Sequence, residues 1–204
     1  MQKIILIGGS PCAGKSSLAK SLAKHFSIPY ISTDIIRSFM QELVTKKEYP
    51  FLFDSVDITP EEYFEKFTPE QIVQNQINES SDVWEGVKRF IETNYDWQSY
   101  VIEGVALMPK ELHEYQPEGK QIIPLFLTDT DVDRLKDVIF NRGLWNDADK
   151  YSDEIKKIEH IWLIKFNEWL QRETDTYQMP LLPVTTREEV FEKALALINE
   201  KFEK

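Results

Sequence analysis

Short apolar runs alternate with longer helical patterns along this chain. Five of the runs are candidates for strands, at residues 3–7, 30–32, 100–104, 121–127 and 181–184. The first run is uninterrupted from Ile4 to Ile7, as in an inner strand of a parallel sheet that is buried on both faces. The segments between the runs are long enough for helical crossovers, so the sequence predicts an α/β fold with a parallel sheet covered on both faces.

Apolar residues at helical spacing predict helices between these runs. Leu18, Leu22 and Phe26 indicate a helix that follows two glycines, and a second helix is expected over 35–44. Two further helical patterns fill most of 130–175. Each of these segments therefore provides a crossover between neighbouring strands.

Residues 45–68 interrupt this alternation with prolines, aromatic residues and acids, and so irregular a segment in a compact domain is more often functional than idle. Thr59 and Thr68 each begin a capping box with proline at the first helical position, and Thr186 is expected to cap a final helix. One face of the long helix after Thr68 carries Ile72, Val73, Gln76, Ile77, Ser80, Val83, Trp84, Val87, Phe90 and Ile91.

The length, charge and composition of the chain exclude several classes of protein. The chain has 204 residues, a formal net charge of −11, one cysteine and three histidines. We expect one domain over 1–204, with no internal disulfide and no histidine-based metal site. The acidic balance argues against nucleic acid or a membrane surface as a partner, and no apolar run approaches membrane-spanning length. The sequence predicts a cytoplasmic protein that is a monomer or a homodimer.

The clearest chemical signal lies directly after the first strand. Gly9–Ser16 fits G-x-x-x-x-G-K-[ST] between a predicted strand and a predicted helix. Backbone N–H groups of such a loop surround nucleotide phosphates, aided by the helix N-terminus. Lys15 would reach the β- and γ-phosphates of ATP, and Ser16 would ligate Mg²⁺. The nucleotide-binding candidates are Gly9, Ser10, Pro11, Cys12, Ala13, Gly14, Lys15, Ser16 and Ser17.

Cys12 lies inside this loop and admits two interpretations. A thiol near a helix N-terminus can have a lowered pKa, which would suit a redox role. A small residue that simply fits the loop is the other interpretation, and it is favoured for an isolated loop cysteine.

Two acids follow predicted strands. Asp34 comes after the second strand, where it could accept a proton from an acceptor hydroxyl, and Arg37, one turn later, could bind an anionic group. Alternatively, Asp34 caps the helix and Arg37 pairs with a surface acid. Glu103 closes the third strand and could act on Mg²⁺ through water, as could Asp34, or it could bind the acceptor or face solvent.

Two arginines follow the fourth strand. If residues 130–150 close over the nucleotide, Arg134 or Arg142 could neutralise charge on the transferred phosphoryl group. Arg142 is favoured because it directly precedes the Gly143 turn. Arg134 is better explained as a solvated helix charge.

These motifs resemble the P-loop small-molecule and nucleotide kinases, and among them the 2-phosphoglycerate-kinase-like branch. The resemblance covers most of residues 3–184 and depends on IILIGGSPCAGKSS, ISTDIIRSFM, YVIEGVALMP and PLFLTDTD followed by NRG. It implies a three-layer fold with a five-stranded parallel sheet in the order 2-3-1-4-5 and a helical lid over 130–150. It also implies that Asp34, Arg37 and Glu103 face the acceptor, beside an insertion and helix over 45–95.

The sequence therefore predicts an ATP- and Mg²⁺-dependent kinase for a small-molecule acceptor, with Lys15, Asp34 and Arg142 as catalytic residues. A nucleotide-binding ATPase switch that acts through a partner, and a kinase for a nucleoside or antibiotic, are the alternatives. Only the second of these retains an acceptor site.

The charge of the acceptor stays open at this point. The branch tends to read EGVH where this chain has Ala106, and residues 45–82 hold three lysines against nine acids. A phosphoglycerate-like anion is favoured only by the bidentate contact that Arg37 could make. Aromatic residues at Phe51, Phe53 and Phe64 would suit a ring equally well.

Overall fold

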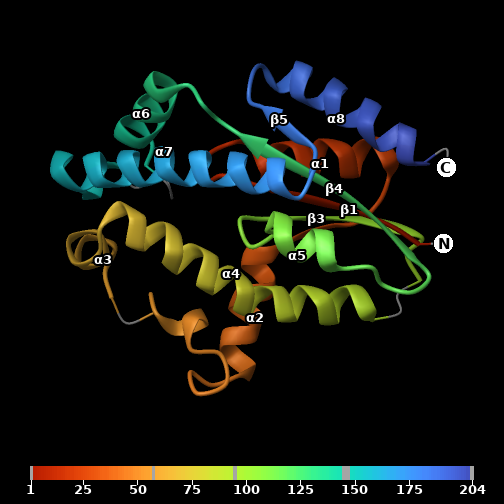
Figure 1. Cartoon of the computed structure of the whole chain (residues 1–204), viewed down its shortest axis with the longest axis horizontal. Coiled ribbons are helices and arrows are strands. Elements are labelled where there is room, and N and C mark those ends of the chain that lie inside the picture. Colours follow the sequence, from red (N-terminus) through yellow and green to blue (C-terminus); the bar gives the residue numbers. More distant parts are fainter. Residues whose placement is uncertain (1, 57, 94–95, 144–147, 203–204) are drawn as a thin grey trace.

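The computed structural model describes residues 2–56, 58–93, 96–143 and 148–202, and its centre is a parallel sheet. Five strands pair in the order β2-β3-β1-β4-β5, which confirms the predicted fold (Figure 1). The strands are β1 (Gln2–Gly9), β2 (Tyr30–Ser32), β3 (Ser99–Glu103), β4 (Lys120–Thr128) and β5 (Leu181–Pro183).

Helices form nearly all of the crossovers between these strands. They are α1 (Lys15–Phe26), α2 (Thr33–Leu43), α3 (Pro60–Lys66), α4 (Pro69–Glu92), α5 (Pro109–Glu114), α6 (Val132–Asn141), α7 (Asp153–Thr176) and α8 (Arg187–Phe202), with 3₁₀ turns at Phe51–Phe53 and Ala148–Lys150. The three predicted caps are confirmed, since Thr59 and Thr68 form complete capping boxes and Thr186 accepts from the backbone N–H of Glu189.

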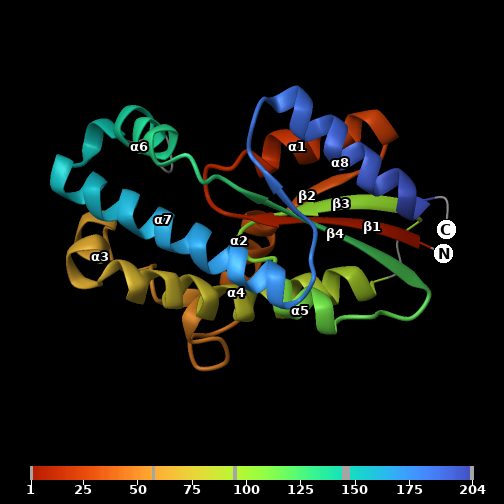
Figure 2. The ribbon, with the colours of Figure 1, turned by 45° about the horizontal axis from the view of Figure 1, so that its top comes forward.

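The alternation of side chains along β1 divides the core into two layers, because successive residues of a strand point to opposite faces. Ile5 and Ile7 pack with α1 and α8 on one face. Ile4 and Leu6 pack on the other with residues of α2, α4 and α7. Figure 2 shows these two helical layers above and below the sheet. All four of these side chains are fully buried, which confirms β1 as an inner strand.

A third apolar cluster lies beyond the end of the sheet to which β1 runs (Figure 1). It joins α3, the start of α4, α6 and the N-terminal part of α7 through Phe64, Ile72, Val73, Leu135, Ile139, Ile155, Trp162, Leu163 and Phe166. This cluster fixes α4 and α7 side by side, bridged at the surface by the 2.9 Å ion pair between Lys165 and Glu70. The two helices therefore form a wall beside the carboxyl ends of the strands, where ligands of open α/β sheets bind.

Two elements differ from the sequence prediction. Helix α2 begins at Thr33 rather than Ile35, because the Ser32 side chain accepts from the backbone N–H of Asp34 and caps the helix. The short helix α5 was not predicted from the sequence. In the described part of the chain, no helix is long and apolar enough to cross a membrane.

Candidate active site

The loop between β1 and α1 has the backbone that phosphate binding needs. Gly9 (φ 135°) passes so close to the backbone of Leu127 that a Cβ at this position would overlap it. Gly14 adopts the left-handed conformation (φ 85°) and caps α1. The Ser10 hydroxyl is buried and has no hydrogen-bond partner among the described residues. A glycine-lined loop that ends at a helix N-terminus and holds a free buried hydroxyl fits nucleotide phosphates.

Lys15, the first residue of α1, brings a positive charge to the end of this loop. Its side chain is buried, and Nζ donates to the carbonyl oxygen of Ser10 at 2.7 Å. Burial lowers the pKa of Lys15, while the nearby Glu103 carboxylate opposes this shift. A buried ammonium with one neutral partner has donors left for an anion. The position therefore suits the phosphates expected here.

Glu103 connects the loop to the third strand. The Ser16 hydroxyl donates to Glu103 Oε1 at 3.0 Å, and the Tyr30 hydroxyl donates to the same oxygen at 2.8 Å. Burial, followed by the contact with Glu103, raises the pKa of Tyr30 to about 12, so this phenol stays a donor. Glu103 is only 3% exposed, which excludes the interpretation that it simply faces solvent. A hydroxyl and a carboxylate side by side are hard oxygen ligands that fit Mg²⁺, directly or through water.

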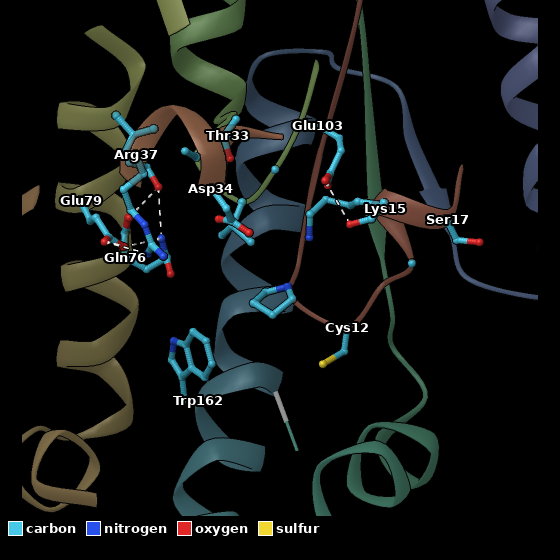
Figure 3. A pocket seen from close by; sticks show the side chains of 18 of the residues that line it. Cys12, Lys15, Ser17, Thr33, Asp34, Arg37, Gln76, Glu79, Glu103 and Trp162 are labelled. Carbon is cyan, nitrogen blue, oxygen red and sulfur yellow. Dashed lines mark hydrogen bonds and ion pairs between the residues drawn. The ribbon is translucent and has the colours of Figure 1, made fainter. Parts of the chain in front are cut away.

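Asp34 lies in the first turn of α2 and is exposed. It is not the helix cap, since Ser32 fills that role, so the capping interpretation is wrong. Asp34 lines the same cavity of about 410 Å³ as Lys15, Ser16 and Glu103. In the view of Figure 3 it lies between Lys15 and Arg37. The structure therefore brings the expected base to the cavity that holds the phosphate loop.

Arg37 also lines this cavity, but it is already paired. Its guanidinium donates to Glu79 Oε1 of α4 at 3.1 Å, and Gln76 donates to the other carboxylate oxygen at 3.4 Å. The partner is not a surface acid, because the Glu79 side chain is only 16% exposed. Burial raises the pKa of Glu79, and the Arg37 charge opposes this shift.

Arg142 ends α6 and contacts the phosphate loop across a long sequence separation. Its guanidinium lies 3.0 Å from the Cys12 sulfur and 3.2 Å from the Gly143 carbonyl oxygen. Burial raises the pKa of Cys12 despite the opposing charges of Arg142 and Lys15. The lowered thiol pKa considered for this residue is therefore wrong. Residues 144–147 of the expected lid lie outside the described part of the chain.

Arg134 is held elsewhere. It makes a two-point contact with the Asp129 carboxylate at 2.6 and 2.7 Å and donates to the Val184 carbonyl at 2.9 Å. The Asp129 side chain is 4% exposed, so Arg134 joins α6 to the ends of β4 and β5. The interpretation of Arg134 as a solvated helix charge is therefore wrong. Of the two arginines considered, Arg142 is the one that contacts the phosphate loop.

The site includes residues that sequence reasoning missed. Glu79 and Trp162 line the cavity, as does Arg187 at the start of α8. The available signal was the pair of polar residues, Gln76 and Ser80, that interrupts the apolar face expected for the long helix. Of the aromatic residues expected near the acceptor, Phe53 instead packs against the core under the sheet.

Comparison with known proteins agrees with this geometry. A family model described as an AAA domain matches residues 3–84. The 2-phosphoglycerate kinase of Methanococcus maripaludis is 25% identical over 208 residues, which cover 98% of this chain and 65% of that protein. The 2-phosphoglycerate kinase of Methanocaldococcus jannaschii is 25% identical over 97% of this chain and 63% of its own length. The chain thus spans slightly less than two thirds of the length of these relatives.

Solved structures share the whole architecture. A gluconokinase from Sinorhizobium meliloti superposes with a TM-score of 0.57 at 15% identity, covering 98% of this chain and 94% of that one. A shikimate kinase from Acinetobacter baumannii gives a TM-score of 0.55 at 13% identity, covering 100% and 96%. At these identities the likeness concerns the fold alone. The chain has the P-loop kinase fold, and its resemblance to the P-loop small-molecule and nucleotide kinases, with the 2-phosphoglycerate-kinase-like branch among them, is confirmed.

Proposed function

We propose that this protein is an ATP- and Mg²⁺-dependent kinase that phosphorylates a hydroxyl group of a small molecule. The observation that carries the proposal is a single cavity lined at one end by Lys15 and Ser16 and at the other by Asp34 and Arg37. Phosphoryl transfer needs a donor phosphate and an acceptor held in line with one another, and little further covalent chemistry from the protein. A cavity that joins both ends meets this need.

The chain's own residues have separate roles in this proposal. Loop amides and Lys15 hold the nucleotide phosphates, and Ser16 ligates Mg²⁺, with Glu103 or Asp34 acting on the ion through water. When bound, ATP with Mg²⁺ supplies the phosphoryl group. Asp34 orients the acceptor hydroxyl and takes its proton as the new oxygen–phosphorus bond forms and ADP leaves. Arg142 neutralises charge on the transferred group.

Two segments complete this assignment. We assign residues 45–95 to the acceptor side, and the ion pair between Arg37 on α2 and Glu79 on α4 supports this for α4. We assign the lid to residues 130–150, and the contact between Arg142 and Cys12 supports a place next to the phosphate loop for the end of α6. The whole chain, 1–204, is assigned to one P-loop kinase domain.

The test measures transfer of label from γ-labelled ATP into a small-molecule metabolite extract. We expect Asp34→Asn to lower the transfer rate by about two orders of magnitude or more, the usual contribution of a general base, with the affinity for ATP and the melting temperature nearly unchanged. Asp133→Asn is the matched control, because Asp133 is likewise an exposed acid in the first turn of its helix. Equal rates in both variants would contradict the role of Asp34.

A further inference from the structure

A second cavity of about 410 Å³ adjoins the first on the acceptor side. The two cavities share four lining residues, Arg37, Gln76, Glu79 and Trp162. The second cavity is therefore the space that an acceptor would enter if its reacting hydroxyl lay at Asp34. The side chains that line this cavity therefore indicate the chemical class of the acceptor, an inference that rests on the proposed function.

The charges around this cavity do not favour a multiply charged anion. Within the part of the chain that the structure describes, Arg37 is the cation that lines it, against the carboxylates of Glu79 and Asp54. Lys46, which is not part of the lining, pairs with Asp54 at 3.6 Å, and both of these side chains are largely exposed. Asp34 adds a third acid in the first cavity, three residues before the shared Arg37. A like charge placed beside these acids, of which Glu79 is mostly buried, weakens binding, which is a common means of rejecting the wrong ligand.

The Arg37 cation is, moreover, already neutralised. Glu79 holds it at 3.1 Å and is itself held by Gln76, in the arrangement visible in Figure 3. An acceptor phosphate that bound the Arg37 nitrogen now held by Glu79 would displace that carboxylate and leave it, mostly buried, without its cation. Removing the cation from a mostly buried carboxylate is unfavourable, although the Arg37 side chain itself is 36% exposed.

Two buried donors are left for the acceptor atoms of a ligand. Arg37 Nε and the indole Nε1 of Trp162 have no hydrogen-bond partner among the described residues. Both side chains line the cavity, and Trp162 is only 5% exposed. Buried donors without a partner are rare, and a ligand that brings its own acceptor atoms accounts for both.

Much of the remaining wall is apolar and aromatic, beside the polar side chains of Ser55 and Asn75. Tyr63 and Phe64 of α3 lie edge to face, with ring centroids 5.8 Å apart, and Phe64 also packs on Trp162. Ile58, Pro60 and Ile72 complete this wall. Ring-lined walls with a few polar groups are typical of sites for partly apolar small molecules.

We infer that the acceptor is an uncharged, ring-bearing hydroxy compound that carries no phosphate group. Its ring lies against Tyr63, Phe64 and Trp162, its polar atoms accept from Arg37 and Trp162, and its reacting hydroxyl faces Asp34. The acceptor would thus differ in charge from 2-phosphoglycerate, which the name of the curated relatives specifies. Ala106, which stands where a histidine is expected from the resemblance, lines the first cavity and brings no charge to it.

The first arm of the test measures binding of 2-phosphoglycerate by calorimetry, with a non-hydrolysable ATP analogue and Mg²⁺ present. Glu79→Gln keeps the shape of the side chain and releases Arg37 from its counter-charge. We expect this variant to bind 2-phosphoglycerate roughly tenfold or more tightly than the wild type. Glu85→Gln is the matched control, because Glu85 is on the same helix, is 43% exposed and pairs with Lys88.

Asp54→Asn keeps the test valid if Glu79→Gln fails to fold, because Asp54 is an exposed acid of the same cavity, with its side chain 49% exposed. We expect it to bind 2-phosphoglycerate more tightly than the wild type, though by less than Glu79→Gln. Wild-type binding as tight as in both variants would overturn the inference.

The second arm measures phosphate transfer from ATP to a panel of uncharged nucleosides and cyclic polyols, with 2-phosphoglycerate as the anionic compound. Transfer to at least one uncharged ring compound, and none to 2-phosphoglycerate, is the expected result. Preferred transfer to 2-phosphoglycerate would overturn the inference while supporting the proposed kinase. Absence of transfer to every compound would count against the kinase, and the binding arm would then decide the charge of the ligand by itself.

Discussion

Hydrogen bonds and ion pairs within the protein hold the polar side chains of this site in position. Lys15 is bound to the Ser10 carbonyl, Ser16 to Glu103, and Arg37 to Glu79. Each charged group therefore has a partner in place before a ligand arrives. Preorganised groups lose little free energy in reorienting when the ligand binds. Asp34 differs from them, since it is exposed on the wall of the cavity, where an acceptor can reach it.

The Cys12 thiol provides a prediction at this scale. Because burial raises its pKa, the thiolate is scarce at neutral pH. Alkylation by iodoacetamide should be slow there and should accelerate steadily as the pH increases toward the raised pKa. Mass spectrometry can follow the reaction at one site, because the chain has a single cysteine. Fast labelling that does not change between mildly acidic and neutral pH would instead indicate a lowered pKa and reopen a redox role.

At the scale of elements, the approach of α2 to β3 positions the two acids of the site. Gly104 follows Glu103, and a Cβ on Gly104 would overlap the side chain of Thr33, the residue before Asp34. The absence of a side chain at this point allows the start of α2 to lie against the end of β3. The same close approach places Asp34 and Glu103 on one cavity.

Gly104→Ala should therefore separate these two elements. We expect a loss of about 1–3 kcal/mol in the free energy of unfolding from the overlap, together with a lower transfer rate. Urea titration and the labelled-ATP assay measure the two effects. Gly119→Ala is the control, because Gly119 also has a positive φ (70°) but a Cβ there would meet nothing within 4 Å. An equal effect of both substitutions would show that backbone strain alone is responsible.

The end of α6 provides the second prediction at this scale. Arg142 contacts the phosphate loop through Cys12, so phosphates bound in the loop would offer it a stronger, charged partner. Amide exchange over residues 132–143 should slow when ATP and Mg²⁺ are added, as mass spectrometry can measure. Helix α5 provides an internal reference, since none of its residues lines either cavity. Unchanged exchange over 132–143 would argue that Arg142 does not engage the nucleotide.

At the scale of the whole molecule, local patterns predicted the sheet and the phosphate loop well. The strand runs and the loop motif depend on neighbours in sequence, and the structure has all five strands and the three caps where they were expected. Glu79 and Trp162 could not be found in this way. Their roles arise only because α4 packs beside α2 and α7, which no sequence spacing encodes.

The charge of the acceptor side shows the same limit. Counting acids over 45–82 indicated a negative segment but could not tell which acid meets Arg37. The structure pairs Arg37 with Glu79, a residue that is mostly buried in the wall between two cavities. The packing of α4 against α2 thus decides which of the many acids neutralises Arg37.

If one cavity transfers phosphate from ATP to an organic acceptor, the γ-phosphoryl label must end up in that acceptor. Incubation of the wild type with γ-labelled ATP, Mg²⁺ and a metabolite extract should place the label in an organic phosphate ester. Lys15→Ala should abolish this product while the melting temperature stays close to that of the wild type, because Lys15 serves phosphate charge rather than packing. Label recovered only as inorganic phosphate, or equal ester formation by Lys15→Ala, would contradict the account.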